Sequence, residues 1–219
     1  YQEVIDTADE YITTYNGDEI VPKLELLKAT ALGKQEGYEA YKKALNYVSL
    51  NYPNDDEGKQ AQLIYSNTLP KLAFTSFMPY DEGKSFKIVY SFSKAEREQA
   101  ENLKILLDEI IIKANYANMI TSIDYYNPDI DFVVVHGLQS RLGSQGFGEI
   151  LYDGEMKAEN KKYKITRTFF DISTENYKTI QIHKNLDVYL NPPEKAGKVL
   201  KEVKELKKKE EKKVVNKKD

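Results

Sequence analysis

The sequence predicts an α+β fold in which paired helices come first and a module of strands and helices follows. Two observations lead to this prediction. Over the first 70 residues, apolar positions recur at the helical spacing of three and four, and the pattern returns after 37 residues. From Phe86 onward, alternating or Val-rich stretches such as Phe86–Phe92 and Ile130–His136 are each followed by a helical pattern.

The repeat becomes visible when Tyr1–Leu27 is laid over Tyr38–Ile64. Aromatic and aliphatic side chains coincide along this alignment, and the polar turn Asn16–Glu19 falls on Pro53–Asp56. Each unit therefore reads as a helix, a short turn with a helix-starting Asp, and a second helix. Helix pairs with a period of roughly 34–40 residues are typical of tetratricopeptide-like arrays.

Three motifs of the second unit resemble the tetratricopeptide proteins of bacterial envelopes. They are Gly37–Leu45, Asn51–Asn54 and Gly58–Ala61. One such unit cannot bury its apolar face alone, so we expect residues 1–70 to be the C-terminal end of a longer array that continues upstream. A free-standing helical hairpin is the alternative.

Residues 71–84 are expected to connect the two modules. Leu69-Pro70 should end the last helix, Asp55–Leu69, because proline cannot donate the backbone hydrogen bond that continues a helix. Residues 78–84 contain proline, aspartate and glycine, which favour turns. The stretch around Phe74 is apolar for a linker. We therefore expect it to fold back as a cap over the apolar side of the last helix and to fix the second module against the array.

Residues 85–191 are predicted to form the second module. Its strands are expected at Ser85–Phe92, Met119–Tyr126, Ile130–His136 and Tyr163–Phe170. A first helix should begin at the capping box Ser93–Glu96 and end at about Ala114, and a second should span Ser140–Tyr152. A third should follow the cap residue Ser173 and span Thr174–Leu190. Two strand–helix–strand halves give the order βαββαβ, which is the ferredoxin-like plan. Murein-binding sporulation-related (SPOR) domains share that plan, so a SPOR-like peptidoglycan-binding module is the alternative function.

A closer resemblance covers most of the chain. The stretches that carry it are Phe132–Leu138, Gly146-Phe147, Glu149–Leu151, Tyr163–Ile165, Ile172–Tyr177 and Gln181–Leu190. They are similar to the C-terminal module of the PorW/SprE family, the tetratricopeptide lipoproteins of the Bacteroidota type IX secretion and gliding machinery, where repeats also precede the module. The resemblance implies a non-catalytic scaffold at the periplasmic face of the outer membrane that links other secretion-machinery proteins in a multiprotein complex. It implies membrane contact only through an upstream lipid anchor that this chain does not contain.

Candidate catalytic motifs are sparse, and no catalysis is predicted. His136-Gly137 after a Val-rich strand resembles the His-Gly pair beside the oxyanion hole of α/β-hydrolases, but Gly143–Gly146 lacks the spacing of a nucleophile elbow. Only His183 is then left as a base, so a hydrolase is a distant third interpretation. We expect His136 to end a strand and Gly137 to permit the turn into a helix. Gly143–Gly146 also matches the phosphate-clamping GXXG of KH domains, but a loop or first helical turn is favoured.

No metal or cofactor is predicted. Asp124, Asp129 and Asp131 surround a turn without the spacing of an EF-hand, which favours a solvated hairpin over a calcium site. His183 and Asp187 have the i, i+4 spacing of a chelating pair, but a surface pair is the favoured interpretation. The absence of cysteine excludes disulfides, thiol catalysis and cysteine zinc sites.

Charge is unevenly distributed along the chain. Between Glu194 and Asp219, eleven lysines against six acids give +5, which leaves −8 on residues 1–193. An acidic folded part disfavours nucleic acid. The Lys-rich tail, residues 192–219, is expected to be a solvated helix or a frayed end, with contact to an acidic partner or an anionic surface as the alternative.

The candidate protein-binding residues are Tyr11, Tyr15, Tyr38 and Tyr41, all within the predicted helix pairs.

Overall fold

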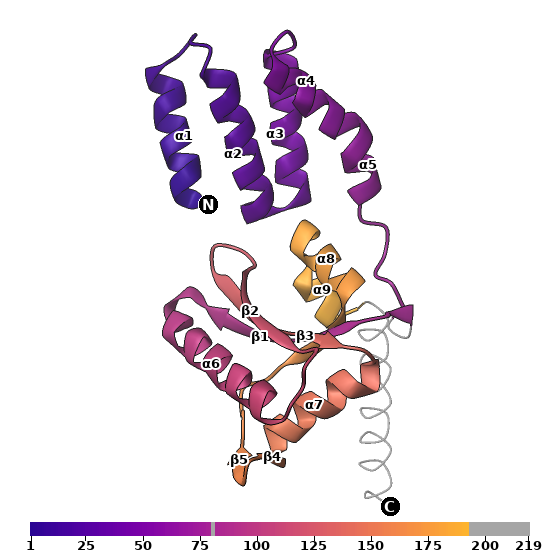
Figure 1. Cartoon of the computed structure of the whole chain (residues 1–219). Helices are drawn as coiled ribbons and strands as arrows, with labels where there is room; N and C mark the ends of the chain where they lie inside the picture. The colour runs from indigo at the N-terminus through magenta and orange to yellow at the C-terminus, as the bar shows by residue number, and fades with distance from the viewer. Residues whose placement is uncertain (80–81, 193–219) are drawn as a thin grey trace, which may run out of the picture. The chain divides into compact units, whose positions relative to one another are not determined.

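The computed structural model describes residues 1–79 and 82–192 (Figure 1). Tyr1–Lys184 form one compact unit, and a second unit begins at Asn185. The first unit contains helices in its N-terminal half and an antiparallel sheet with further helices after them, so the predicted α+β class is confirmed. Of the predicted Lys-rich tail, residues 192–219, all but residue 192 lie outside the described part of the chain.

The N-terminal half is a series of antiparallel helix pairs. Each helix packs on the next one along the chain, and a small core gathers Ala29, Leu45, Val48, Ala61 and Leu69. The offset of 37 residues places the first helix on the third and the second on the fourth, as the sequence predicts. The helices are α1 (Gln2–Thr14), α2 (Val21–Glu36), α3 (Tyr38–Asn51) and α4 (Asp56–Leu63).

The prediction that Leu69-Pro70 ends the last helix is wrong. After α4 the chain makes a π-helical turn, Ile64–Thr68, and then continues as α5 (Leu69–Leu72). Pro70 lies in the first turn of α5, where a missing N–H is tolerated. The wider π turn carries Ser66, whose carbonyl would meet the proline ring in an uninterrupted α-helix, and so it lets the helix pass the proline.

The second half is built on a four-stranded antiparallel sheet with the order β2-β3-β1-β6. One helix connects β1 to β2, and another follows β3. A capping box of Ser93 and Glu96 leads into the first of these helices, as predicted. The elements are β1 (Phe86–Ser93), α6 (Arg97–Lys113), β2 (Ile120–Tyr125), β3 (Ile130–Leu138), α7 (Arg141–Asp153) and β6 (Phe170–Ser173).

The predicted fourth strand, Tyr163–Phe170, is wrong. Its first residue ends a small hairpin of β4 (Met156–Ala158) and β5 (Lys161–Tyr163), whereas the edge strand β6 begins at its last residue. Arg167 explains why the segment between them leaves the strand conformation. Its guanidinium donates to the Ser91 carbonyl at 2.9 Å and to both carboxylate oxygens of Glu96 at 3.0 Å.

The predicted terminal helix, Thr174–Leu190, is divided in the structure. Ser173 caps α8 (Thr174–His183) by accepting from the Asn176 N–H, as predicted, but the helix ends at Lys184 in the left-handed conformation (φ 52°). A short helix, α9 (Leu186–Leu190), lies in the second unit. The break matters because it determines where the Lys184 side chain goes.

Helices cover both faces of the sheet. One face packs against α6 and α7 around a core that includes Tyr90, Leu107, Val133 and Leu151. The opposite face packs against α8, where the Phe132 and Tyr177 rings lie with centroids 6.3 Å apart. The C-terminal end of α8 thereby faces the helix pairs, and this is where the candidate site forms.

Candidate functional site

A tyrosine-lined cleft of about 580 Å³ lies where the helix pairs meet β2 and α8. Its volume is in the range of ligand-binding sites. Three charged side chains contribute to the lining, namely Lys34, Asp124 and Lys184. Tyrosine rings supply much of the wall: Tyr1, Tyr38, Tyr41, Tyr125 and Tyr177.

A glycine brings the two sides of the cleft together. Gly37, between α2 and α3, has φ +94° and ψ −160°, a conformation that is essentially restricted to glycine. A Cβ there would lie 2.7 Å from the Ile182 carbonyl oxygen and 2.9 Å from Lys184 Cγ. The turn between α2 and α3 therefore rests directly on the C-terminal end of α8.

An aromatic cluster forms a second contact between the helix pairs and α8. The His183 ring lies 5.0 Å from the Tyr38 ring and 5.4 Å from the Phe74 ring, centroid to centroid. His183 Nε2 donates to the Leu72 carbonyl at 2.8 Å, and the Tyr38 hydroxyl donates to the Leu69 carbonyl at 3.1 Å. His183 is thus part of this contact.

The connecting segment also binds the other end of α8. The Met78 N–H donates to Asn176 Oδ1 at 2.8 Å, and Asn176 Nδ2 donates back to the Met78 carbonyl at 2.9 Å. Asn176 is buried. The segment therefore contacts α8 as well as the helix pairs, and Leu63, on the last helix pair, remains 61% exposed.

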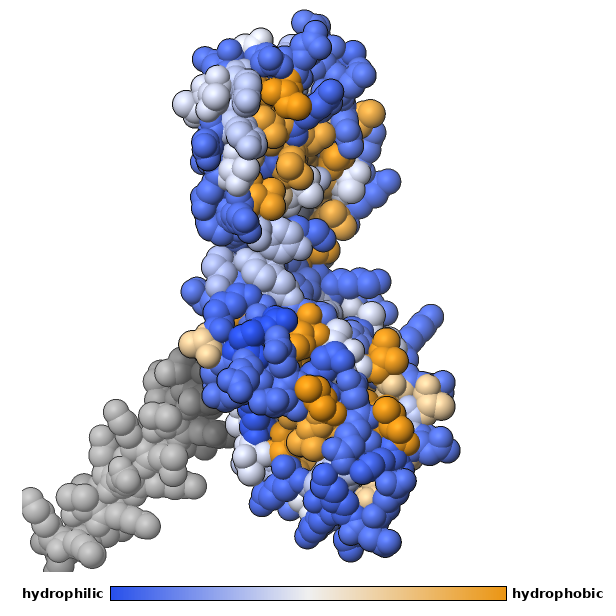
Figure 2. Space-filling view, turned by 60° about the vertical axis from the view of Figure 1, so that its left-hand side comes forward, coloured by the Kyte–Doolittle hydropathy of each residue, from blue (hydrophilic) through white to orange (hydrophobic). Residues whose placement is uncertain are grey.

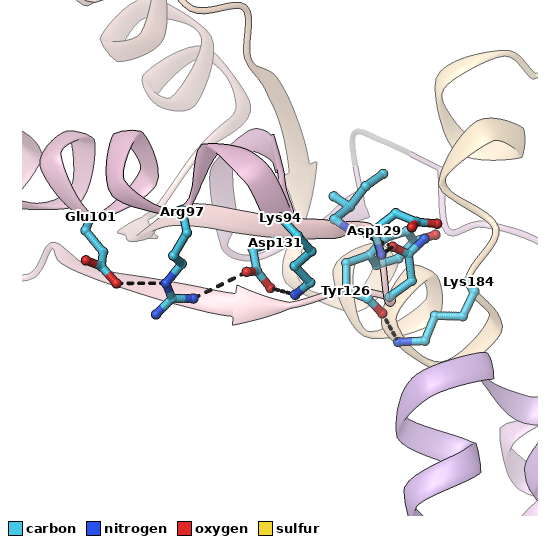
Figure 3. Close-up of polar contacts among 9 residues, drawn as sticks. Lys94, Arg97, Glu101, Tyr126, Asp129, Asp131 and Lys184 are labelled. Carbon is cyan, nitrogen blue, oxygen red and sulfur yellow. Dashed lines mark hydrogen bonds and ion pairs between the residues drawn. The ribbon is translucent and has the colours of Figure 1, made fainter. Parts of the chain in front are cut away.

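Because α8 ends at Lys184, the Lys184 side chain lines the cleft and contacts Tyr126 (Figure 3). Its Nζ donates to the Tyr126 carbonyl at 2.5 Å and lies 5.2 Å from the Tyr126 ring centroid. Burial, with a contribution from Lys34, lowers the pKa of Lys184 to about 8. It is still mostly protonated at neutral pH.

Two further cations near this edge, Lys94 and Arg97, are neutralised by acids. Lys94 and Arg97 both bind the buried carboxylate of Asp131, and Arg97 Nε also donates to Glu101 at 2.8 Å (Figure 3). Lys94 Nζ lies 4.4 Å from the Tyr125 ring centroid. Asp131 therefore has a structural role in an ion-pair network.

A chain of hydrogen bonds runs under α8 and reaches the cleft. Its first pair is Lys87 and His136, and His136 lies next to a bulge in β3, where Gly137 has φ +89° and the register against β1 shifts. His136 therefore lies inside β3, and Gly137 does not make the turn into the next helix, which corrects the prediction. Lys87 Nζ donates to His136 Nδ1 at 2.9 Å, and burial, reinforced by Lys87, lowers the pKa of the imidazole.

The same chain continues through Ser122 to Asp124. The Ser122 hydroxyl donates to Asp124 Oδ1 at 2.6 Å, so the 2.7 Å contact between Ser122 Oγ and His136 Nε2 is made with the imidazole N–H donating. The other Asp124 oxygen accepts from the Tyr177 hydroxyl at 2.6 Å. This direction is the reverse of a nucleophile activated by a histidine base, in which the serine would donate to the imidazole.

The residues of the hydrolase and metal interpretations are not assembled into such sites. Ser144, within the Gly143–Gly146 motif at the start of α7, is buried and donates to the Arg141 carbonyl at 2.8 Å. Asp124 and Asp131 are engaged as described above. Among residues 1–79 and 82–192, no group of three or more acidic or histidine side chains is placed to hold a metal ion.

The four candidate tyrosines separate into two pairs. Tyr38 and Tyr41 line the cleft, and Tyr41 packs closely over Gly33, whose added Cβ would lie 2.8 Å from the tyrosine Cβ. Tyr11 and Tyr15 do not line it; they are exposed on α1 and its end, with ring centroids 5.9 Å apart. Sequence reasoning missed Lys184, Lys34 and Ser122, since a lysine or serine is informative only once its neighbours are known.

The chain matches no known family model and no curated protein sequence. In the described part of the chain, none of the helices combines the length and the apolar character that crossing a membrane requires.

Proposed function

We propose that this chain is a non-catalytic assembly module of the PorW/SprE type, which links components of the type IX secretion and gliding machinery at the periplasmic face of the outer membrane. Hydrophobic surface on the helix pairs carries the proposal (Figure 2). Leu27, Leu50 and Leu63 are 52%, 68% and 61% exposed, and Tyr11 and Tyr15 add further exposed apolar surface. Large apolar side chains exposed on the surface of a domain are candidate sites of protein–protein contact.

The proposal includes a tetratricopeptide-like array and a ferredoxin-like sheet. The 37-residue offset between helix pairs supports the first. The strand order β2-β3-β1-β6, with α6 and α7 on one face, supports the second, and the β4–β5 hairpin is then an insertion before the last strand.

The experiment is affinity capture from envelope extracts of a bacterium that secretes by the type IX route. We expect secretion-machinery proteins to be recovered and identified by mass spectrometry. Leu27→Asp and Leu63→Asp, on the exposed surface of the helix pairs, should reduce recovery. Leu142→Asp should not, because Leu142 is 80% exposed on α7, away from those helices. Equal recovery with all three variants would contradict the proposal.

A SPOR-like murein-binding module is the competing proposal, because the sheet plan is shared. Sedimentation with purified sacculi distinguishes the two. Retention on sacculi at moderate salt, together with failure to capture secretion proteins, would replace the scaffold proposal with the murein-binding one.

A further inference from the structure

We propose that the tyrosine-lined cleft binds a carboxylate of a peptide, with the charged group at Lys184 and Lys34 and the flanking apolar side chains against the tyrosines. The inference rests on the proposed function only in taking the ligand from a protein partner. Its evidence is the cleft itself, which is distinct from the apolar surface that carries that function.

The first observation is a half-buried ammonium with only neutral acceptors. Lys184 Nζ has three donor hydrogens, and the hydrogen bond found for it goes to the Tyr126 carbonyl. Within the described residues, neither Lys184 nor Lys34 forms an ion pair with a carboxylate, whereas Lys94 and Arg97 nearby share Asp131. A buried cation without an anion is costly, and an anionic ligand would offset that cost.

Asp124 does not fill this role, although it lines the same cleft. Both of its oxygens accept hydroxyl hydrogen bonds, from Ser122 and from Tyr177. The charges that act on Lys184 are consistent with this, because its pKa is lowered by burial and by Lys34, with no acid contributing. The two lysines therefore give one side of the cleft a net positive charge.

The rest of the lining fits the apolar part of a peptide. The Tyr38 hydroxyl is occupied by the Leu69 carbonyl, so its ring contributes mainly apolar surface, and Leu69 and Leu72 extend that surface. Tyr125 stands at the other side, with its ring centroid 5.0 Å from that of Tyr1 in an edge contact. Tyrosine walls offer large contact area at low conformational entropy cost.

The surrounding charge favours a small anionic group over a polyanion. Residues 1–193 carry a net charge of −8, so the long-range field opposes nucleic acid and anionic membranes. A single carboxylate needs only the local field of the two ammonium groups. The ligand we infer is therefore a peptide that presents one carboxylate, from a side chain or from its C-terminus, next to aromatic or aliphatic residues.

The experiment titrates the full chain with three synthetic peptides at low ionic strength, followed by calorimetry and by NMR shifts. The probes are acetyl-Phe-Glu-Phe-amide, acetyl-Phe-Gln-Phe-amide and acetyl-Phe-Gln-Phe with a free C-terminal carboxylate. At least one carboxylate peptide should bind at least about tenfold more tightly than the neutral amide, with shifts at cleft residues. Binding of the first or of the third probe tells whether a side-chain or a terminal carboxylate is recognised.

Three variants assign the binding to the lysines. Lys184→Met and Lys34→Met should each weaken the carboxylate peptide at least about tenfold and bring it close to the neutral one. Lys178→Gln, an exposed lysine on the same helix that does not line the cleft, should leave binding unchanged. Lys34 is exposed at the rim, so its variant keeps the test informative if Lys184→Met unfolds.

The inference would be overturned if neither carboxylate peptide bound at millimolar concentration, or if the neutral and acidic probes bound equally. Equal weakening by Lys34→Met and Lys178→Gln would also overturn it, because the loss of affinity would then come from the change in net charge and not from the cleft. Failure here with successful capture of secretion proteins would leave the proposed function intact, and the reverse outcome would leave the cleft assignment intact.

Discussion

Replacing Gly37 by Ala should destabilise the protein more than the same change at Gly17. Both glycines have positive φ, +94° and +88°, so both alanines adopt an unfavourable backbone conformation. Such strain costs about 1–3 kcal/mol. They differ in surroundings, because a Cβ at Gly17 meets nothing within 4 Å, whereas at Gly37 it meets the Ile182 carbonyl oxygen at 2.7 Å.

That contact must be relieved by moving α8 away from the turn between α2 and α3. Forcing extra volume into a packed contact costs about 1–3 kcal/mol, so this is the expected difference in the free energy of unfolding between the two variants. For a chain of this size each kcal/mol lowers Tm by about 2–4 °C. Gly37→Ala should therefore melt at least about 2 °C below Gly17→Ala.

Urea unfolding and amide exchange check this expectation. Gly37→Ala should also speed exchange in the first turn of α3 and the last turn of α8, and Gly17→Ala should affect neither. If the two variants lose the same stability and show the same exchange, the contact between the turn and α8 contributes nothing, and the reasoning about the cleft's two walls is refuted.

Three further predictions concern single side chains. The pKa of His136 is lowered on folding, so the unfolded chain binds a proton more readily, and stability should fall as the pH drops below about 6.5. Urea unfolding between pH 5 and 7.5 should show a free energy of unfolding that falls with falling pH, and His136→Gln should flatten that dependence. Phe74→Asp removes the ring that packs on His183 and should speed amide exchange in residues 44–69 and in α8 together, whereas a simple tether would leave both unchanged. Gly146→Ala, in the interior of α7 with open space at its Cβ, should raise stability by about 0.5–1 kcal/mol in thermal melts, and a loss would show that the helix is strained there.

Much of the fold could be predicted because its signals are local. The capping box Ser93–Glu96, the cap residue Ser173 and the alternation in Phe86–Phe92 depend on residues a few positions apart, and each produced the expected element. The failures arose where a distant partner decided the conformation. Nothing within Tyr163–Phe170 shows that Arg167 will bind Glu96 and the Ser91 carbonyl, and these contacts end the strand pattern.

The candidate site was harder to predict, because it is formed by side chains far apart in sequence. Of the four tyrosines, only Tyr38 and Tyr41 line the cleft, and no pattern in the sequence distinguishes them from Tyr11 and Tyr15. The helical spacing of apolar residues predicts helices in the region of all four. It says nothing about which helices meet α8.

The mispredicted end of α8 and the cleft have one physical cause. Helical periodicity favours a continuous helix to Leu190, but the chain adopts the left-handed conformation at Lys184 instead. A continuing helix would hold Lys184 in helical geometry, whereas the left-handed residue places its Nζ on the Tyr126 carbonyl and its Cγ beside Gly37. A non-glycine residue in this conformation is uncommon and persists where its surroundings determine it. The contacts of Lys184 and Gly37 supply those surroundings, so the break in the helix and the shape of the cleft stabilise each other.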